Sequence, residues 1–68
     1  MTTKFLRLAD VIDRTGLGRS TIYKLMTEDD FPPNVSLGAR AVAWVEQEIE
    51  DWIFSRIAQR DNQESKAA

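Results

Sequence analysis

Two glycines separated by a single leucine, at positions 16 to 18, constrain this chain more than any other feature. Gly16 suits the left-handed residue that ends a helix, because glycine has no Cβ to clash there. Gly18 suits the N-cap of a following helix, and Leu17 between them has the spacing to pack against both helices. The sequence therefore predicts two helices joined by a very tight turn.

The helix after this turn, which we expect from Arg19 to between Thr27 and Asp29, has two chemically distinct faces. Ile22, Leu25 and Met26 fall on one apolar stripe with the 3.6-residue period of a helix, so this face packs on the core. The opposite face and its flanks carry cations and hydroxyls, without a carboxylate before Glu28: Arg19, Ser20, Thr21, Tyr23, Lys24 and Thr27. Such side chains bind phosphates and base edges, which predicts contact with a DNA groove. The alternative is a surface helix whose polarity has no function.

The segments around these helices follow from hydrophobic spacing and from chain breakers. Residues 5–8 fit a short extended segment and residues 8–15 a first helix. Beyond the two prolines, residues 35–37 and 41–44 predict two strands joined by a type II′ turn at Gly38-Ala39. This register sets Val35 opposite Val42 and directs Val35, Leu37, Val42 and Trp44 inward. A bulged three-residue loop is the alternative, and it would orient Arg40 differently.

Residues 45–60 predict the longest helix of the chain. Its core-facing stripe recurs at helical spacing: Val45, Ile49, Trp52, Ile53 and Ile57. Phe54 lies off this stripe, as a stray exposed aromatic or as part of a protein contact. We expect residues 1–4 to be a flexible N-terminus, residues 5–60 to form the domain, and residues 61–68 to be a disordered tail.

The charge of the chain is unevenly distributed. The formal net charge of the 68 residues is −2, and the sequence pI is about 4.9. Up to Thr27, however, five basic residues stand against two acidic ones, whereas Glu28 to Asp30 and Glu46 to Asp51 are acidic. Exposed charges are screened beyond roughly 10 Å at ordinary salt, so the local face matters more than the sum. We therefore expect the acidic segments to point away from DNA.

The composition also excludes several classes of function. The chain has no cysteine and no histidine, which removes thiolate and imidazole metal ligands and the commonest general base. Its carboxylate pairs lie on expected helix ends and solvated faces, so we expect no enzyme, no cofactor, no metal and no small-molecule ligand. There is no apolar run of membrane-spanning length and no signal-peptide pattern, which favours a soluble intracellular protein without membrane contact.

The order of the expected elements defines a fold class. The chain is mainly α with a small β-hairpin: short strand, helix, turn, helix, hairpin, helix. This is the order of a winged helix-turn-helix, in which the second helix enters the major groove and the hairpin wing contacts the flanking backbone or minor groove. Arg40 then lies at the wing tip, and Ser36 and Arg7 complete the DNA-binding candidates.

Several motifs of this sequence resemble one family of small regulators. They are Leu6-Arg7-Leu8, the run from Thr15 to Lys24, Phe31-Pro32, the run from Leu37 to Trp44, and the run from Glu48 to Ile53. Together they resemble the AlpA family of phage and prophage regulators, over about residues 5–60. The resemblance implies a MerR-like or excisionase-like winged helix-turn-helix that binds DNA and regulates transcription. It also implies a cytoplasmic, nucleoid-associated location in a bacterial host. It implies that residues 19–24 match the recognition helix and that Gly38 to Arg40 match the wing.

The resemblance and the residues together leave two functions open. The first is a sequence-specific regulator of a mobile element that binds double-stranded DNA and controls integrase expression or excision. Because so small a domain reads few base pairs, this function calls for self-association on adjacent sites or a recombinase partner. The second is a protein-binding module that uses the acidic face of the last helix, either to regulate a recombinase or polymerase or to mimic DNA.

Overall fold

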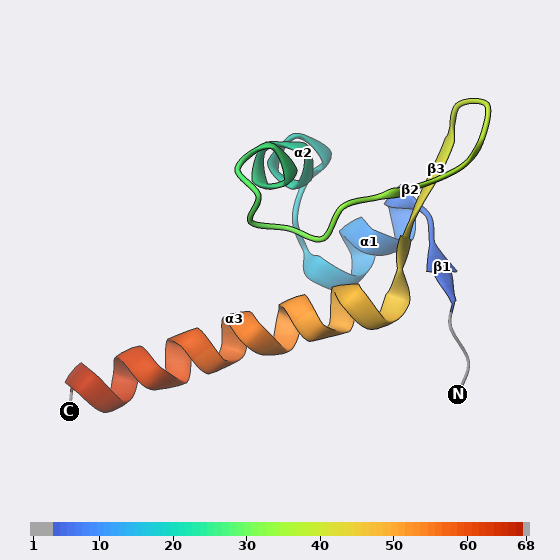
Figure 1. Cartoon of the computed structure of the whole chain (residues 1–68). Coiled ribbons are helices and arrows are strands. Elements are labelled where there is room, and N and C mark those ends of the chain that lie inside the picture. The colour runs from blue at the N-terminus through green and yellow to red at the C-terminus, as the bar shows by residue number, and fades with distance from the viewer. Residues whose placement is uncertain (1–3, 68) are drawn as a thin grey trace.

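The structure, a computed structural model, describes the backbone of residues 4–67 and the side chains up to residue 62. Its elements follow in the order β1 (Phe5–Leu6), α1 (Leu8–Thr15), α2 (Arg19–Thr27), β2 (Val35–Gly38), β3 (Ala41–Val45) and α3 (Glu46–Ala67) (Figure 1). The described part of the chain is mainly helical with a small antiparallel sheet, as predicted. This arrangement is compatible with a small helix-turn-helix-like fold.

The strand β3 is the centre of the sheet, whose order is β1-β3-β2. The short β1 pairs antiparallel with the end of β3, where Phe5 faces Val45 and Leu6 faces Trp44. Just beyond this pair, the backbone N–H of Glu46 donates to the carbonyl oxygen of Lys4 over 2.8 Å. Lys4 is therefore held to the start of α3, whereas the rest of the expected flexible N-terminus lies outside the described residues.

One hydrophobic core joins all the elements except β2. Its buried side chains come from β1, α1, α2, the segment after α2, β3 and α3: Leu6, Val11, Ile22, Phe31, Trp44 and Ile49. Leu25 and Met26 of α2 are half-buried and pack against this cluster, as the apolar stripe predicts. The core therefore fixes which face of α2 points to solvent.

The tight turn between α1 and α2 has the geometry that its two glycines predict. Gly16 is left-handed, with φ 74°, and its N–H donates to the carbonyl oxygen of Ile12 over 2.8 Å. Gly18 is the extended N-cap of α2, with φ −79°. The Thr15 hydroxyl donates to the Val11 carbonyl over 2.8 Å and accepts from the Leu17 N–H over 3.2 Å. The turn is therefore held by side-chain as well as backbone hydrogen bonds.

The predicted register of the hairpin is wrong. Val35 pairs with Ala43 and Ser36 with Val42, and a bulge at Leu37 precedes the Gly38–Ala41 pair. The turn is formed by Ala39 and Arg40 instead of Gly38 and Ala39, because the bulge adds a residue to β2. As a result Leu37 is 44% exposed and Val35 37% exposed, and neither packs inward as expected.

The predicted last helix is wrong at both ends. It begins at Glu46, because Val45 belongs to β3 and pairs with Phe5. It continues to Ala67, through the segment expected to be a disordered tail. No glycine or proline occurs after Gly38, so the sequence has no strong helix breaker in this region. Ile57, expected to face the core, is 40% exposed, and the side chains that follow it up to residue 62 are exposed as well. The C-terminal half of α3 extends beyond the body of the domain (Figure 1).

Candidate nucleic-acid interface

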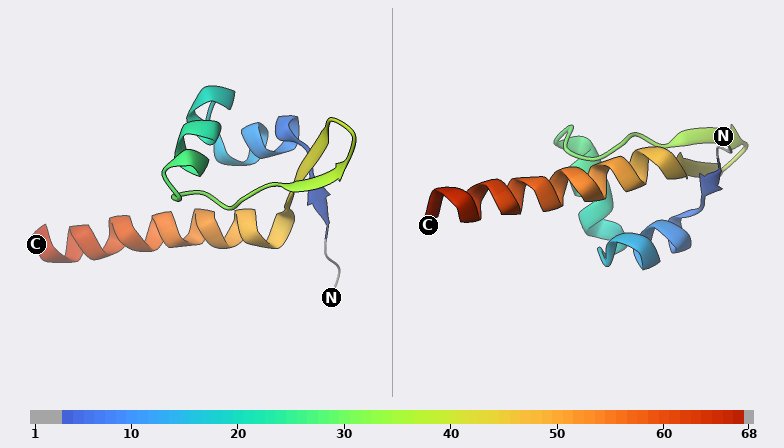
Figure 2. Two further views of the ribbon diagram at one scale, coloured as in Figure 1. Left: turned by 45° about the horizontal axis from the view of Figure 1, so that its top comes forward. Right: turned by 90° about the horizontal axis from the view of Figure 1, so that it is seen from below.

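The outer face of α2 holds most of the candidate residues predicted from the sequence. Ile22 is fully buried beneath this helix, which fixes its rotation about its own axis. The residues that this rotation exposes are Arg19, Ser20, Thr21, Lys24 and Thr27. In Figure 1 and in the left view of Figure 2, α2 and the tip of the β2–β3 hairpin project to the same side of the molecule, away from α3. The helix that carries these exposed polar residues and the hairpin tip therefore lie on one side of the molecule.

Tyr23 differs from the other candidates because its ring is half-buried. The ring meets the buried Trp44 of β3 edge to face, with centroids 6.3 Å apart. The guanidinium carbon of Arg19 also lies near this ring, 6.0 Å from its centroid. The Tyr23 carbonyl also accepts a hydrogen bond from the Thr27 hydroxyl over 3.0 Å. Tyr23 thus links the exposed Arg19 to the central strand. The contact between Tyr23 and Trp44 joins distant segments, and nothing in the sequence pattern predicted it.

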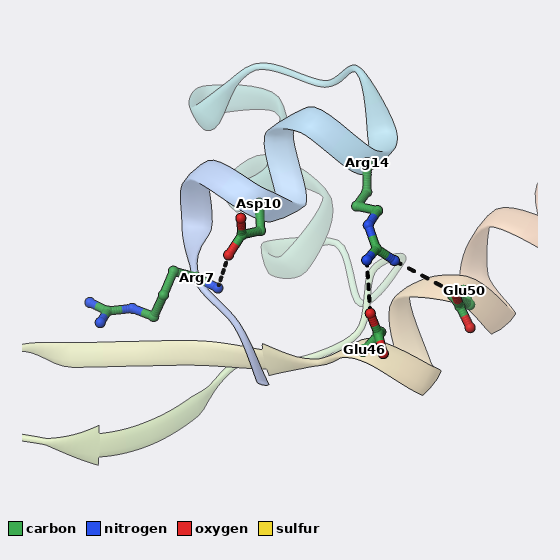
Figure 3. Close-up of polar contacts among 5 residues, drawn as sticks. All are labelled: Arg7, Asp10, Arg14, Glu46 and Glu50. Atoms are coloured by element: carbon green, nitrogen blue, oxygen red, sulfur yellow. Dashed lines mark hydrogen bonds and ion pairs between the residues drawn. The ribbon is translucent and has the colours of Figure 1, made fainter. Parts of the chain in front are cut away.

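The remaining candidates lie outside α2. Arg40 is exposed at the hairpin turn with a left-handed φ of 61°, and Ser36 is exposed on β2. Arg7 occupies the N-cap of α1, where its backbone N–H donates to the Asp10 carboxylate over 3.3 Å. Its guanidinium extends away from α1 (Figure 3). The structure thus gathers six candidates on α2 and distributes the other three over two separate segments.

The arginines and lysines divide into two groups by their partners. Arg14 of α1 pairs with Glu46 at 2.8 Å and with Glu50 at 3.6 Å (Figure 3), and Arg56 of α3 pairs with Asp30 at 2.6 Å. Arg60 pairs with its neighbour Asp61. Within residues 4–62, by contrast, no carboxylate pairs with the candidate cations Arg7, Arg19, Lys24 and Arg40. The cations of the candidate interface are therefore available for an external anion.

The end of α2 is anchored to α3 through the acidic residues that follow it. Asp30 donates its N–H to the Leu25 carbonyl over 2.8 Å, which holds the segment after α2 to the last turn of the helix. The indole N–H of Trp52 donates to the Asp30 carbonyl over 2.8 Å, and the Trp52 ring meets the buried Phe31 edge to face at 4.8 Å. These contacts fix α2 relative to α3.

Two other kinds of feature are absent from the described residues: a metal-binding cluster and a membrane-spanning helix. No group of three or more acidic, histidine or cysteine side chains among them is placed to hold a metal ion. No helix in the same part of the chain is long and apolar enough to cross a bilayer.

The fold and the cationic helix face together define a class: small helix-turn-helix-like proteins with a hairpin beside the exposed helix. Residues 4–57 match the family described as "Prophage CP4-57 regulatory protein (AlpA)". Because this match covers most of the chain, the chain belongs to the AlpA family, in agreement with the resemblance in its motifs.

Two curated proteins show the relationship in detail. An uncharacterised protein, ORF88, of enterobacteria phage P4 is 49% identical over 57 residues, which are 84% of this chain and 65% of the phage protein. The chain therefore spans somewhat less than two thirds of that relative. The DNA-binding transcriptional activator AlpA of Escherichia coli K12 is 37% identical over 59 residues, covering 78% of this chain and 84% of the relative.

Proposed function

We propose that this chain is a sequence-specific DNA-binding transcriptional regulator of a phage or another mobile element. In this proposal α2 enters the major groove, and the β2–β3 hairpin acts as a wing on the flanking backbone or minor groove. The single observation that carries the proposal is the set of exposed cations without carboxylate partners on α2 and the hairpin. The name of the Escherichia coli relative, a DNA-binding transcriptional activator, supports it.

The dimensions of α2 suit this role. An α-helix with its side chains is about 10–12 Å in diameter, which fits a major groove about 12 Å wide. The nine residues of α2, at about 1.5 Å rise, give a length of roughly 13 Å along the groove. In helix-turn-helix proteins the N-terminal residues of the second helix contact base edges. In this chain those residues are Arg19, Ser20 and Thr21. Lys24 and Thr27, one and two turns further on, then face phosphates.

The acidic residues of α3 do not oppose this docking. Glu46 and Glu50 both pair with Arg14, so part of their charge is compensated. In addition, α3 lies on the other side of the molecule from the projecting α2 and hairpin tip (Figure 2). Since phosphate attraction is screened within roughly 10 Å at ordinary salt, the negative net charge leaves the cationic face effective.

One short recognition helix reads only a few base pairs, so specificity must come from more than one contact. We propose that several copies bind neighbouring sites, or that a recombinase partner adds contacts, when this chain controls integrase expression or excision. The double-stranded DNA next to its own gene is the first target to examine.

A salt titration tests the proposal. Affinity is measured for a random-sequence duplex and for the duplex that flanks the gene, between about 50 and 200 mM salt. We expect affinity to fall steeply with salt on both duplexes, and binding to the flanking duplex to be tighter. The double variant Arg19→Ala/Lys24→Ala serves as the matched control for charge on α2. If the unaltered chain binds neither duplex at the lowest salt, the proposal is overturned.

A further inference from the structure

Two apolar side chains of α3 are exposed beside each other on the helix surface. Phe54 is 66% exposed and Ile57 40% exposed, and their three-residue spacing makes them neighbours. Phe54 lies two residues after Trp52, which places it roughly 160° around the helix from the side that packs on the domain. The two side chains form contiguous exposed apolar surface, and such surface marks protein contacts when polar residues surround it.

The helix that carries this pair projects beyond the body of the domain. Its C-terminal half extends away from the other elements in every view (Figures 1 and 2). The side chains of residues 57–62 are all exposed. Most helices in proteins are stabilised by packing of an apolar face, which this part of α3 lacks within the described residues. A partner that covers Phe54 and Ile57 would supply that packing.

The charges around the pair indicate what kind of partner fits. Glu50 and Asp51 lie one turn before Phe54, on the same face of α3. Because Glu50 also contacts Arg14 at 3.6 Å, Asp51 carries most of the uncompensated charge of this rim. Asp51 is exposed, and among the side chains up to residue 62 it accepts a hydrogen bond only from the Gln47 amide, over 3.0 Å. Arg56, by contrast, lies roughly 160° away from Phe54 and holds Asp30. The face is therefore apolar with an acidic rim, and its complement is apolar with a basic rim.

A second copy of the chain does not provide this complement. If two α3 helices pair antiparallel with Phe54 of one against Ile57 of the other, the spacing sets Glu50 of one copy beside Asp61 of the other. Parallel pairing sets Glu50 beside Glu50. Like charges at close spacing are unfavourable in both arrangements. DNA is disfavoured for the same reason, since the acidic rim repels phosphates.

We propose that this α3 face, comprising Glu50, Asp51, Phe54 and Ile57, docks a partner protein through an apolar segment flanked by lysine or arginine. The proposal does not depend on DNA binding, because this face points away from α2. A regulator with both surfaces would hold DNA on one side and its partner on the other.

The test uses the full chain and a fluorescein-labelled helical peptide with leucines on one stripe, flanked by lysines. Fluorescence anisotropy should show saturable binding, and Phe54→Ala should weaken it about tenfold, as loss of a buried aromatic anchor does. The matched control is Leu37→Ala, which shortens a comparably exposed apolar side chain on the hairpin and should leave peptide affinity unchanged.

Charge is tested with a second matched pair. Asp51→Asn should weaken peptide binding, whereas Asp13→Asn, which neutralises an exposed carboxylate on α1, should not. Equal peptide affinity in all variants, or no saturable binding, overturns the proposal. Sedimentation that shows self-association abolished by Phe54→Ala overturns it in favour of a second copy. DNA affinity is measured in parallel: Phe54→Ala should leave it unchanged, so that failure of the DNA-binding proposal is recorded separately.

Discussion

The indole Nε1 of Trp52 donates a hydrogen bond over 2.8 Å to the backbone carbonyl of Asp30, which follows the end of α2. The carboxylate of the same aspartate accepts from Arg56, whose guanidinium carbon lies 4.9 Å from the Trp52 ring centroid. Asp30 is thus bound twice by α3, through its backbone and through its side chain. This link holds the candidate recognition helix at a fixed position relative to the longest helix of the fold.

Replacing Trp52 separates its hydrogen bond from its packing. Trp52→Phe keeps a ring against Phe31 but removes the donor to Asp30, which we expect to cost about 1 kcal/mol. Trp52→Ala also removes the ring, and we expect a loss of about 3 kcal/mol. Urea unfolding followed by circular dichroism measures both. Phe54→Ala on the solvent side of α3 is the control and should change stability little; a Trp52→Ala protein as stable as the parent contradicts the packing described here.

Local sequence signals predicted the elements that depend on local chemistry. Gly16 and Gly18 define the turn between α1 and α2 because their backbone conformations are set by residue type. The apolar stripe of α2 likewise identified Ile22 as its buried residue. Hence the exposed face of α2, where most candidate site residues lie, could be read from the spacing alone.

Contacts between distant segments left no comparable signal. The bulge at Leu37 shifts the hairpin register by one residue, and pairing with β1 draws Val45 into β3. The Tyr23–Trp44 and Asp30–Trp52 contacts join residues far apart in the chain, so periodicity within one element does not reveal them. The helical path of residues 61–67 was missed because their polarity was taken to indicate disorder.

The two glycines of the turn should respond in opposite directions to substitution. Neither would bring a Cβ within 4 Å of another atom, so backbone conformation alone separates them. Gly16→Ala forces a Cβ into the left-handed region at φ 74° and should cost about 1 kcal/mol. Gly18→Ser adds a capping hydroxyl at an extended N-cap and should stabilise the folded protein by about 0.3 kcal/mol. Thermal melts of both variants show whether the signs differ.

Arg40 allows binding to be separated from stability at the hairpin tip. Its φ of 61° is unfavourable for a side chain with a Cβ, so Arg40→Gly should not lower the melting temperature. The same change removes the cation of the proposed wing and should weaken binding to duplex DNA. Arg40→Lys keeps the charge and is the matched control, expected to retain most of the affinity. Full DNA affinity in Arg40→Gly would show that the hairpin tip does not contact DNA.

Arg19 and Lys24 provide the most direct test of the DNA-binding face. Both side chains are exposed and lack a carboxylate partner in the described part of the chain, so alanine at either position should leave the melting temperature nearly unchanged. Each substitution should weaken DNA binding and, where the side chain contacts phosphate, reduce the slope of log affinity against log salt by about 1. Arg60→Ala removes a cation from the projecting part of α3 and should leave the slope unchanged, because that helix lies away from the proposed interface. Equal effects of all three changes would mean that DNA responds to overall charge, and α2 would then have no special role in binding.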